Sequence, residues 1–132
     1  ALGTIFGGRV MEWIDLAAAI AAKRHARQSC VTASMDELDF IHPIKISHIV
    51  ILKAAVNYTG KTSLEVGVRI EAEDPFTGER THTASAYLTF VAIDKKGAPV
   101  SVPPVQPETE DEKRRYTEAE TRRKRRLQRK NH

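Results

Sequence analysis

A single aspartate in an apolar stretch is the first candidate for chemistry. Between Val10 and Ala22 the only charged residues are Glu12 and Asp15, and no Lys or Arg stands three or four positions from Asp15 to pair with it in a helix. An unpaired carboxylate is costly to bury, so it is seldom found in an enclosed helix without a function. We therefore take Asp15 as the candidate catalytic residue. The alternative is a structural acid that shares a solvated strip with Glu12 or accepts a hydrogen bond from a backbone amide.

Two glycines, Gly7 and Gly8, precede this helix. The first amides of a helix have no acceptor within it, and the positive end of the helix dipole favours an anion. Glycine has no side chain to keep a ligand away from such amides. An acid two turns into the helix and open amides at its start could therefore supply a base and an oxyanion hole.

The other reactive residue types form no comparable pattern. None of the five histidines has the close partners of a zinc motif, and we expect neither a metal site nor a cofactor. Cys30 is the only cysteine, which excludes an intramolecular disulfide and agrees with a reducing compartment. It is more typical of a strand position than of a nucleophile. Because we also expect no signal peptide and no transmembrane segment, we place the protein in the cytoplasm.

Four segments rich in alternating or β-branched residues predict strands after the helix. They run from Cys30 to Phe40, from His48 to Tyr58, from Leu64 to Glu71 and from Thr81 to Ile93. Turn residues separate them at His42-Pro43, at Thr59-Gly60-Lys61 and from Asp74 to Glu79. One helix followed by four strands with short connections predicts an antiparallel sheet.

Small residues dominate the expected inner face of this sheet. In the first strand we expect Val31, Ala33 and Met35 to share that face, and in the last strand Ala84 and Ala86 have the same role. Such side chains would let the sheet close tightly around the helix. The predicted fold class is α+β, with an antiparallel sheet wrapped around one long central helix and a C-terminal helical tail.

The C-terminal part of the chain differs from the rest in charge. We assign residues 1–103 to one globular domain and residues 104–132 to a charged helical tail after a proline-rich linker. From 108 to 132 there are ten Lys and Arg against six Asp and Glu, whereas the remainder has eleven of each. A nucleic-acid or membrane partner could thus be argued only from the tail, and we expect neither.

Within the tail, acidic residues come first and basic residues follow, as the helix dipole prefers. The run 122–130 has no apolar stripe, so we expect its outer end to be a solvated or frayed helix whose cations are dispensable for turnover. The functional alternatives for this run are binding to nucleic acid, to an acidic membrane surface or to the phosphates of a ligand.

Three segments taken together resemble a known family. They are Leu2-Gly3-Thr4-Ile5-Phe6-Gly7-Gly8 with Met11 and Asp15-Leu16-Ala17-Ala18, then Val31-Thr32-Ala33-Ser34-Met35-Asp36 with Asp39-Phe40, and finally Pro104-Val105-Gln106-Pro107-Glu108-Thr109-Glu110-Asp111-Glu112-Lys113-Arg114-Arg115. In this order and spacing they are similar to the hotdog-fold acyl-CoA thioesterases, specifically the cytosolic acyl-CoA hydrolase group, over nearly the whole chain.

The resemblance implies a hotdog fold, and a dimer with one continuous sheet that often assembles further as a trimer of dimers. It implies hydrolysis of fatty acyl-CoA to free fatty acid and CoA at sites on the subunit interface. Asp15 would activate water or attack the thioester carbonyl, and the amides of Gly7 and Gly8 would polarise that carbonyl.

The resemblance also implies further contacts with the substrate. Lys61, Thr62 and Ser63 match a segment that binds substrate or CoA in the partner's site. The family usually carries an Asn just before the position of Ala1, contributed across the dimer, and no residue of this sequence takes its place.

A thioester is electrophilic and has a fair leaving group, so one carboxylate and an oxyanion hole can suffice without a Ser-His triad or a metal. Two other functions remain open. A hotdog hydratase would call for a His beside the acid on the helix, and none is there. A non-catalytic module could bind CoA or nucleic acid. A thiol-release assay on several acyl-CoAs separates the three.

Overall fold

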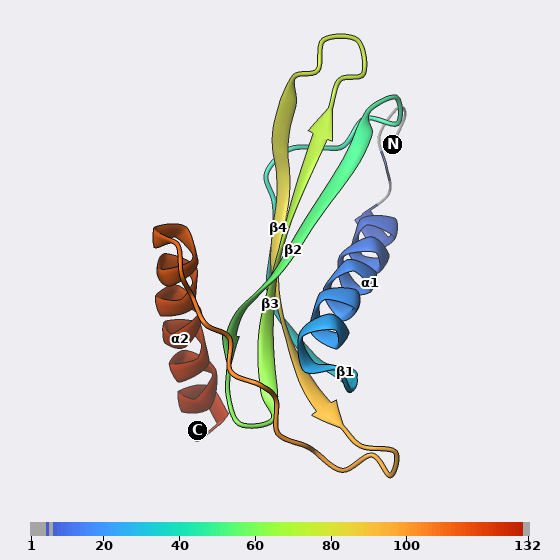
Figure 1. The fold of residues 1–132 in the computed structure, drawn as a ribbon. Coiled ribbons are helices and arrows are strands. Elements are labelled where there is room, and N and C mark those ends of the chain that lie inside the picture. Colours follow the sequence, from blue (N-terminus) through green and yellow to red (C-terminus); the bar gives the residue numbers. More distant parts are fainter. Residues whose placement is uncertain (1–4, 6, 131–132) are drawn as a thin grey trace.

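The computed structural model describes Ile5 and residues 7–130, so the first four residues and Phe6 of the family-like N-terminal segment lie outside the described part. The elements are α1 (Gly7–Ala26), β1 (Ser29–Phe40), β2 (Ile49–Thr59), β3 (Ser63–Glu73), β4 (Arg80–Ile93) and α2 (Glu110–Lys130) (Figure 1). The predicted helix, four strands and helical tail are all confirmed. Neither described helix is long and apolar enough to cross a membrane.

The four strands form one antiparallel sheet in the order β1-β4-β3-β2. Helix α1 crosses one face of this sheet and α2 lies on the opposite face (Figure 1). We call these the α1 face and the α2 face. Alternation along β3 explains the division, because Leu64, Val66 and Val68 are buried towards α1 while Glu65 and Arg69 point the other way.

Helix α1 is buried along a single stripe of residues at four-residue steps. The stripe consists of Val10, Ile14, Ala18, Ala22 and Ala26. Its alanines let the helix approach the sheet closely, as the small residues of β4 also do. The expectation of a helix enclosed on all sides is wrong for the single chain, because one sheet covers only one side of a helix. Leu16 is 63% exposed and Ile20 is 53% exposed.

Strand β1 departs from simple alternation. A register shift between Thr32 and Ser34 leaves Ala33 without a partner on β4, and a second shift follows Met35. Thr32 therefore lies opposite the buried Phe90 and Met35 lies opposite the buried Leu88. The expectation that Val31, Ala33 and Met35 share the inner face is wrong, since the bulge changes the parity of the strand after Thr32.

Helix α2 begins with a capping box. The amide of Glu112 donates to Thr109 Oγ1 at 3.1 Å, and Glu112 Oε1 accepts from the Thr109 amide at 2.9 Å. The amides of Thr109 and Glu108 both donate to this carboxylate and lower the pKa of Glu112, because they favour its charged form. The acids-first order of the tail thus has its predicted structural meaning.

The first part of the run 122–130 is docked on the sheet and not solvated, whereas the side chains of 127–129 at its outer end are exposed. Arg122 donates two hydrogen bonds to Glu65, at 2.9 and 2.8 Å, and its guanidinium lies 3.6 Å from the centroid of the Tyr87 ring. Arg126 bonds to Asp36 at 3.0 Å. Arginine can cover a sheet through its stem and still satisfy a buried carboxylate, so no apolar stripe is needed. A chain cut before Arg122 would leave two carboxylates of the α2 face unpaired.

We expect Arg122→Ala to destabilise the fold by about 3 kcal/mol, because breaking a buried ion pair strands the remaining charge. The Glu65 side chain is only 5% exposed and that of Arg122 only 12%. Denaturant unfolding measures the change. Arg125→Ala, an exposed arginine on the same helix, is the control and should shift stability by less than about 0.5 kcal/mol. Equal stability of the two variants would show that the pair does not hold α2.

Candidate active site

Asp15 lies on the side of α1 that the sheet leaves open. It is exposed, and the Thr32 hydroxyl on β1 donates to its Oδ1 at 3.0 Å. Among the described residues it makes no ion pair, as the sequence predicted from its helical neighbours. The carboxylate is therefore oriented by a neutral donor, while the rest of it is free to meet water or a ligand.

Thr32 is the residue of this site that the sequence did not reveal. The predicted alternation placed Val31 on the inner face and so turned Thr32 away from the helix. Cys30, two positions before Thr32, packs against the core and pairs with the buried Ala92. Residues two apart in a strand share a face, so Cys30 and Thr32 both face α1.

Gly7 and Gly8 are the first two residues of α1, whereas we expected them just before it. Gly7 is exposed and Gly8 is half-buried. A Cβ placed on Gly7 would have Phe40, at the far end of β1, as its neighbour at 4.0 Å. At 1.5 Å per residue, the Gly8 amide lies about 10 Å along the helix axis from Asp15.

Lys61, Thr62 and Ser63 occupy the turn that joins β2 to β3. The carbonyl of Lys61 accepts from the Val102 amide at 2.9 Å, and that of Thr62 from the Ala92 amide at 2.9 Å. The first bond holds the turn against the chain that leads to α2, and the second holds it against β4.

Ser63 lines a cleft of about 550 Å³ that lies mainly between α2 and strands β1 and β4, which we call the Ser63 cleft. Arg123, Arg126 and Arg129 of α2 also line it. The Arg123 guanidinium lies over Gly60, since a Cβ there would be 3.0 Å from its Nη1. The run 122–130 thus contributes arginines to this cleft, which is relevant to the alternative that the run binds the phosphates of a ligand.

One chain does not bring the predicted site residues together. Ser63 pairs with Val91, which pairs with Val31 near the start of β1, whereas Gly7 lies beside Phe40 at its end. Nine strand residues separate these positions, or roughly 30 Å. Asp15 and the glycines also lie on the α1 face, and the Ser63 cleft lies on the α2 face.

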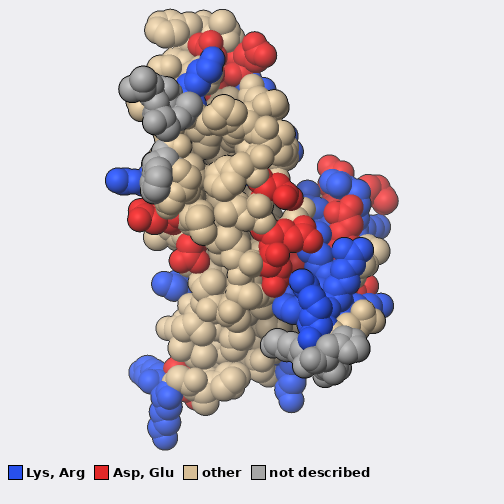
Figure 2. Space-filling view, turned by 180° about the vertical axis from the view of Figure 1, so that it is seen from behind, with Lys and Arg blue, Asp and Glu red and all other residues tan. Residues whose placement is uncertain are grey.

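Several apolar side chains are exposed on α1 and β1, the two elements that carry Asp15 and Thr32. Figure 2 shows Lys and Arg gathered over α2, while much of the remaining surface in that view carries no charge. Exposed apolar residues on α1 and β1 include Met11, Leu16, Ile20, Val31 and Phe40. An apolar cleft of about 330 Å³ lies between α1 and β2, lined by Trp13, Leu16 and Leu52 among others.

Other reactive groups stay apart from this site. No cluster of three or more His, Cys, Asp or Glu suited to a metal occurs among the residues that the structure describes. Burial raises the pKa of the Cys30 thiol, against the opposing effect of Lys23, so the thiol is protonated at neutral pH. This agrees with the interpretation of Cys30 as a strand residue.

Comparison with known proteins gives a consistent family. Residues 2–78 match the model of the thioesterase superfamily. A Bacillus subtilis protein named as an uncharacterized acyl-CoA thioester hydrolase is 46% identical over 98% of this chain and 75% of its own length. A rat cytosolic acyl coenzyme A thioester hydrolase is 36% identical over 91% of this chain and 32% of its own length.

Solved structures agree closely in fold. A hexameric acyl-CoA thioesterase, solved without ligand, superimposes with a TM-score of 0.93 at 46% identity, over 97% of this chain and 82% of that one. The acyl-CoA hydrolase of Staphylococcus aureus, solved with butyryl coenzyme A, coenzyme A and coenzyme A disulfide, gives 0.91 at 45% identity, over 97% and 78%. Variants of it with alanine for one threonine, one aspartate and one asparagine have also been solved.

The helix lying on a four-stranded antiparallel sheet, the family match and the two sets of relatives agree. The chain belongs to the thioesterase superfamily and, within it, to the hotdog-fold acyl-CoA hydrolases.

Proposed function

We propose that this acyl-CoA hydrolase cleaves the thioester of fatty acyl-CoA to free fatty acid and CoA, with Asp15 as the catalytic residue. The observation that carries the proposal is the state of Asp15. It is exposed on α1, has no ion pair among the described residues and is held by one hydroxyl donor at 3.0 Å. A structural carboxylate would be paired or fully bonded, as Glu65 is.

The chemistry of a thioester suits a lone carboxylate. The carbonyl is electrophilic and the thiolate leaves readily, so a base that takes a proton from water, or a carboxylate that attacks directly, can start the reaction. In either route the charge that develops on the carbonyl oxygen needs donors nearby. We assign this role to the amides of Gly7 and Gly8, which lie at the positive end of α1.

Asp15 and these amides cannot serve the same thioester from one chain. Oxyanion donors must lie about 3 Å from the carbonyl oxygen, yet the Gly8 amide lies about 10 Å along the helix from Asp15. The proposed site therefore takes Asp15 from one subunit and the glycine amides from its partner. An antiparallel pair of α1 helices would bring the start of one alongside the middle of the other.

Alanine variants of the Staphylococcus aureus hydrolase support the choice of residues. The replaced aspartate and threonine lie 17 positions apart in that protein, which is the separation of Asp15 and Thr32 here. The replaced asparagine precedes that aspartate by the spacing from Asp15 to the position just before Ala1. Thr32 is then the residue that orients the catalytic carboxylate.

We place the phosphates of CoA at the Ser63 cleft and assign Lys61, Thr62 and Ser63 to substrate binding. Arg123 and Arg129 line the same cleft and form no ion pair with a carboxylate of the described residues, and guanidinium groups bind phosphate through two parallel hydrogen bonds. Because this cleft lies on the opposite face of the sheet from Asp15 in one chain, it would serve a neighbouring subunit's substrate. Coenzyme A is bound in the Staphylococcus aureus relative.

We also propose that the protein works as a homo-oligomer built on a dimer, with the hexamer of its relative as the larger assembly. The exposed apolar side of α1 and the free edge of β1 offer the surfaces for a second copy. The apolar cleft beside Leu16 gives an acyl chain a place to lie. The cytosolic rat relative supports a cytoplasmic location.

Residues 1–103 remain proposed as the catalytic domain, with 104–132 as a separate segment docked on it. The competing function is a non-catalytic module that uses the basic tail to bind nucleic acid. The structure gives it less support, because Arg122 and Arg126 are engaged by carboxylates of the sheet. Asp15, by contrast, forms no ion pair among the described residues.

Asp15→Asn should lower turnover on acyl-CoA by several orders of magnitude and leave the fold and CoA affinity near those of the parent. An amide keeps the shape and the hydrogen bond to Thr32, but it can neither accept a proton from water nor attack a carbonyl. Thiol release from a panel of acyl-CoAs, a melting curve and a CoA isotherm make the test. Glu12→Gln, an exposed acid one turn earlier, is the control and should turn over normally. More than about a tenth of the parental rate in Asp15→Asn, a deficit of only about 1.4 kcal/mol in barrier, would remove Asp15 from the mechanism.

Thr32→Val should reduce turnover about tenfold, because the carboxylate loses the donor that orients it. Thr32→Ser keeps a hydroxyl and should stay near the parental rate. Both variants are compared at saturating substrate, with melting curves alongside. If the Thr32→Val and Thr32→Ser variants have the same turnover, the hydrogen bond of 3.0 Å between Thr32 and Asp15 has no role in turnover.

Leu16→Asp combined with Ile20→Asp should shift the sedimentation mass towards that of one chain and reduce turnover more than tenfold. Charges on this exposed apolar side would oppose a second copy, and the site needs both copies. The control is Phe76→Asp, which changes a 93% exposed residue in the turn between β3 and β4. A parent that sediments as one chain at micromolar concentration would rule out the shared site.

A further inference from the structure

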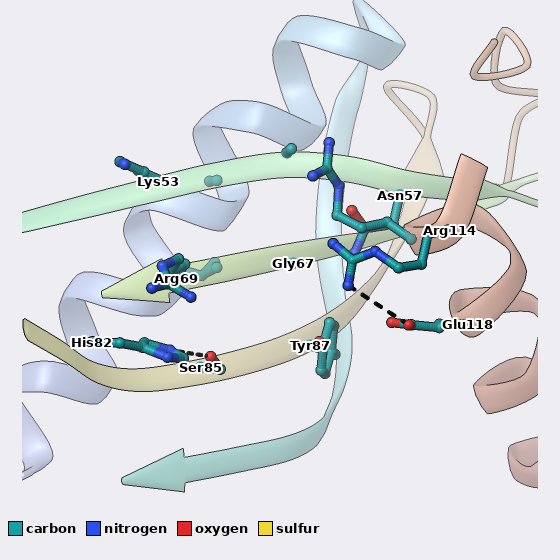
Figure 3. A pocket seen from close by; sticks show the side chains of 13 residues that line it. Lys53, Asn57, Gly67, Arg69, His82, Ser85, Tyr87, Arg114 and Glu118 are labelled. Atoms are coloured by element: carbon teal, nitrogen blue, oxygen red, sulfur yellow. Dashed lines mark hydrogen bonds and ion pairs between the residues drawn. The ribbon is translucent and has the colours of Figure 1, made fainter. Parts of the chain in front are cut away.

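A second basic cleft lies on the α2 face of the sheet, apart from Asp15 and from the Ser63 cleft. Its walls include Lys53, Gly67 and Arg69 on the sheet and Arg114 and Arg115 on the first turns of α2, and we call it the β2–α2 cleft (Figure 3). Its volume is about 490 Å³, within the range of small-molecule sites. None of the residues assigned to hydrolysis lines it.

The sheet wall of this cleft carries more positive than negative charge. Lys53 and Arg69 both pair with Glu71, at 3.2 and 2.8 Å, and Arg80 approaches the same carboxylate at 3.6 Å. Hydrogen bonds from Arg69 and Lys53 lower the pKa of Glu71, so it is ionised at neutral pH. One carboxylate thus holds three cations in place, and Lys53 and Arg69 remain about half exposed towards solvent.

The helix wall adds two further arginines. Arg114 pairs with Glu118 at 3.8 Å and with Asp111 at 3.6 Å, whereas Arg115 makes no ion pair with any carboxylate of residues 7–130. In Figure 3, the Arg114 side chain extends from α2 towards the strands that carry Lys53 and Arg69. Cations from two elements therefore face one space.

The floor of the cleft is shaped by a glycine and a buried amide. Gly67 lies in the middle of β3, and a Cβ there would come within 2.5 Å of Asn57 Nδ2 and 3.4 Å of the Tyr87 ring. Glycine inside a strand is unfavourable and often marks close approach of another group. Here it lowers the floor and admits the Asn57 side chain, which comes from a bulge in β2.

Asn57 leaves one polar atom unsatisfied. The residue is only 4% exposed, its Nδ2 donates to Glu65 Oε1 at 3.2 Å, and its buried Oδ1 has no partner among the described residues. Native proteins rarely leave a buried carbonyl oxygen without a donor, so such an atom calls for an explanation. A ligand that carries an N–H or O–H group beside its anion would supply the donor.

We propose that the β2–α2 cleft binds a small molecule with more than one phosphate and with a hydrogen-bond donor. Guanidinium and ammonium groups on two walls match several phosphate oxygens, and one phosphate alone would not reach both walls. The ligand has two possible sources, the diphosphate of CoA itself, which would then not lie at the Ser63 cleft, or a separate phosphorylated metabolite. The first source rests on the proposed function, and the second does not.

Pyrophosphate is the probe, titrated calorimetrically into the full chain and into three variants. Lys53→Gln changes the sheet wall, Arg115→Gln changes the helix wall, and Arg125→Gln removes an exposed charge from the same helix outside the cleft. Binding should weaken about tenfold in each cleft variant, or about 1.4 kcal/mol, and less than twofold in the control. No binding at millimolar pyrophosphate, or equal losses in all three variants, would overturn the site.

Kinetics separates the two sources of the ligand. If the cleft holds the phosphates of CoA, Lys53→Gln and Arg115→Gln raise KM for acyl-CoA at unchanged kcat, and pyrophosphate competes with substrate. If it holds a separate metabolite, KM is unchanged and pyrophosphate still binds the enzyme saturated with CoA. An acidic segment of a second copy would instead cover the cleft. In that case an amine reagent would modify Lys53 only after the assembly is dissociated, and the proposal would fail whatever the outcome for Asp15→Asn.

Discussion

The contact between α1 and the sheet determines where Asp15 points. Every residue of α1 that the chain buries lies in one stripe at four-residue steps, and three of the five members are alanines. The close approach that alanine permits also fixes the rotation of the helix, because a turn by one residue would drive Asp15 or Trp13 against the strands. The outward side of the helix follows from this packing. Asp15 is consequently open to solvent and close enough to β1 to receive the Thr32 hydroxyl.

The α2 face of the sheet carries charged side chains that must be paired. Alternation in β3 places Glu65 and Arg69 in mid-strand on the face turned away from the core, where an apolar helix would strand their charges. Arginines of α2 cover that face instead, and each buried carboxylate there has a guanidinium or ammonium partner. Buried ion pairs add little net stability compared with apolar packing, but they are intolerant of misplacement. The docked position of α2 is therefore specific, and it creates the two basic clefts along its length.

Most of the fold could be predicted from the sequence, and the site only in part. Strand boundaries agreed within about two residues because strong alternation and turn residues coincide there. The prediction of the inner face of β1 was wrong because a bulge cannot be recognised in the pattern of residue types. For the same reason the sequence did not reveal that Thr32 faces the helix. The docking of α2 on the sheet was not predicted, for another reason. Arg122 and Arg126 look solvated in a sequence, and only the three-dimensional structure shows that Glu65 and Asp36 lie beneath them.

The position of the reactive groups links turnover to assembly. The carboxylate and the helix-start amides of one chain lie too far apart to serve one carbonyl, and the Ser63 cleft lies on the other face of the sheet. A monomer therefore contains every group of the proposed site, but it does not bring these groups together. Asp15 shares α1 with exposed apolar residues, so the proposed association that would cover them is the same event that would complete the proposed site. An isolated subunit would then be unable to hydrolyse thioesters until it is assembled.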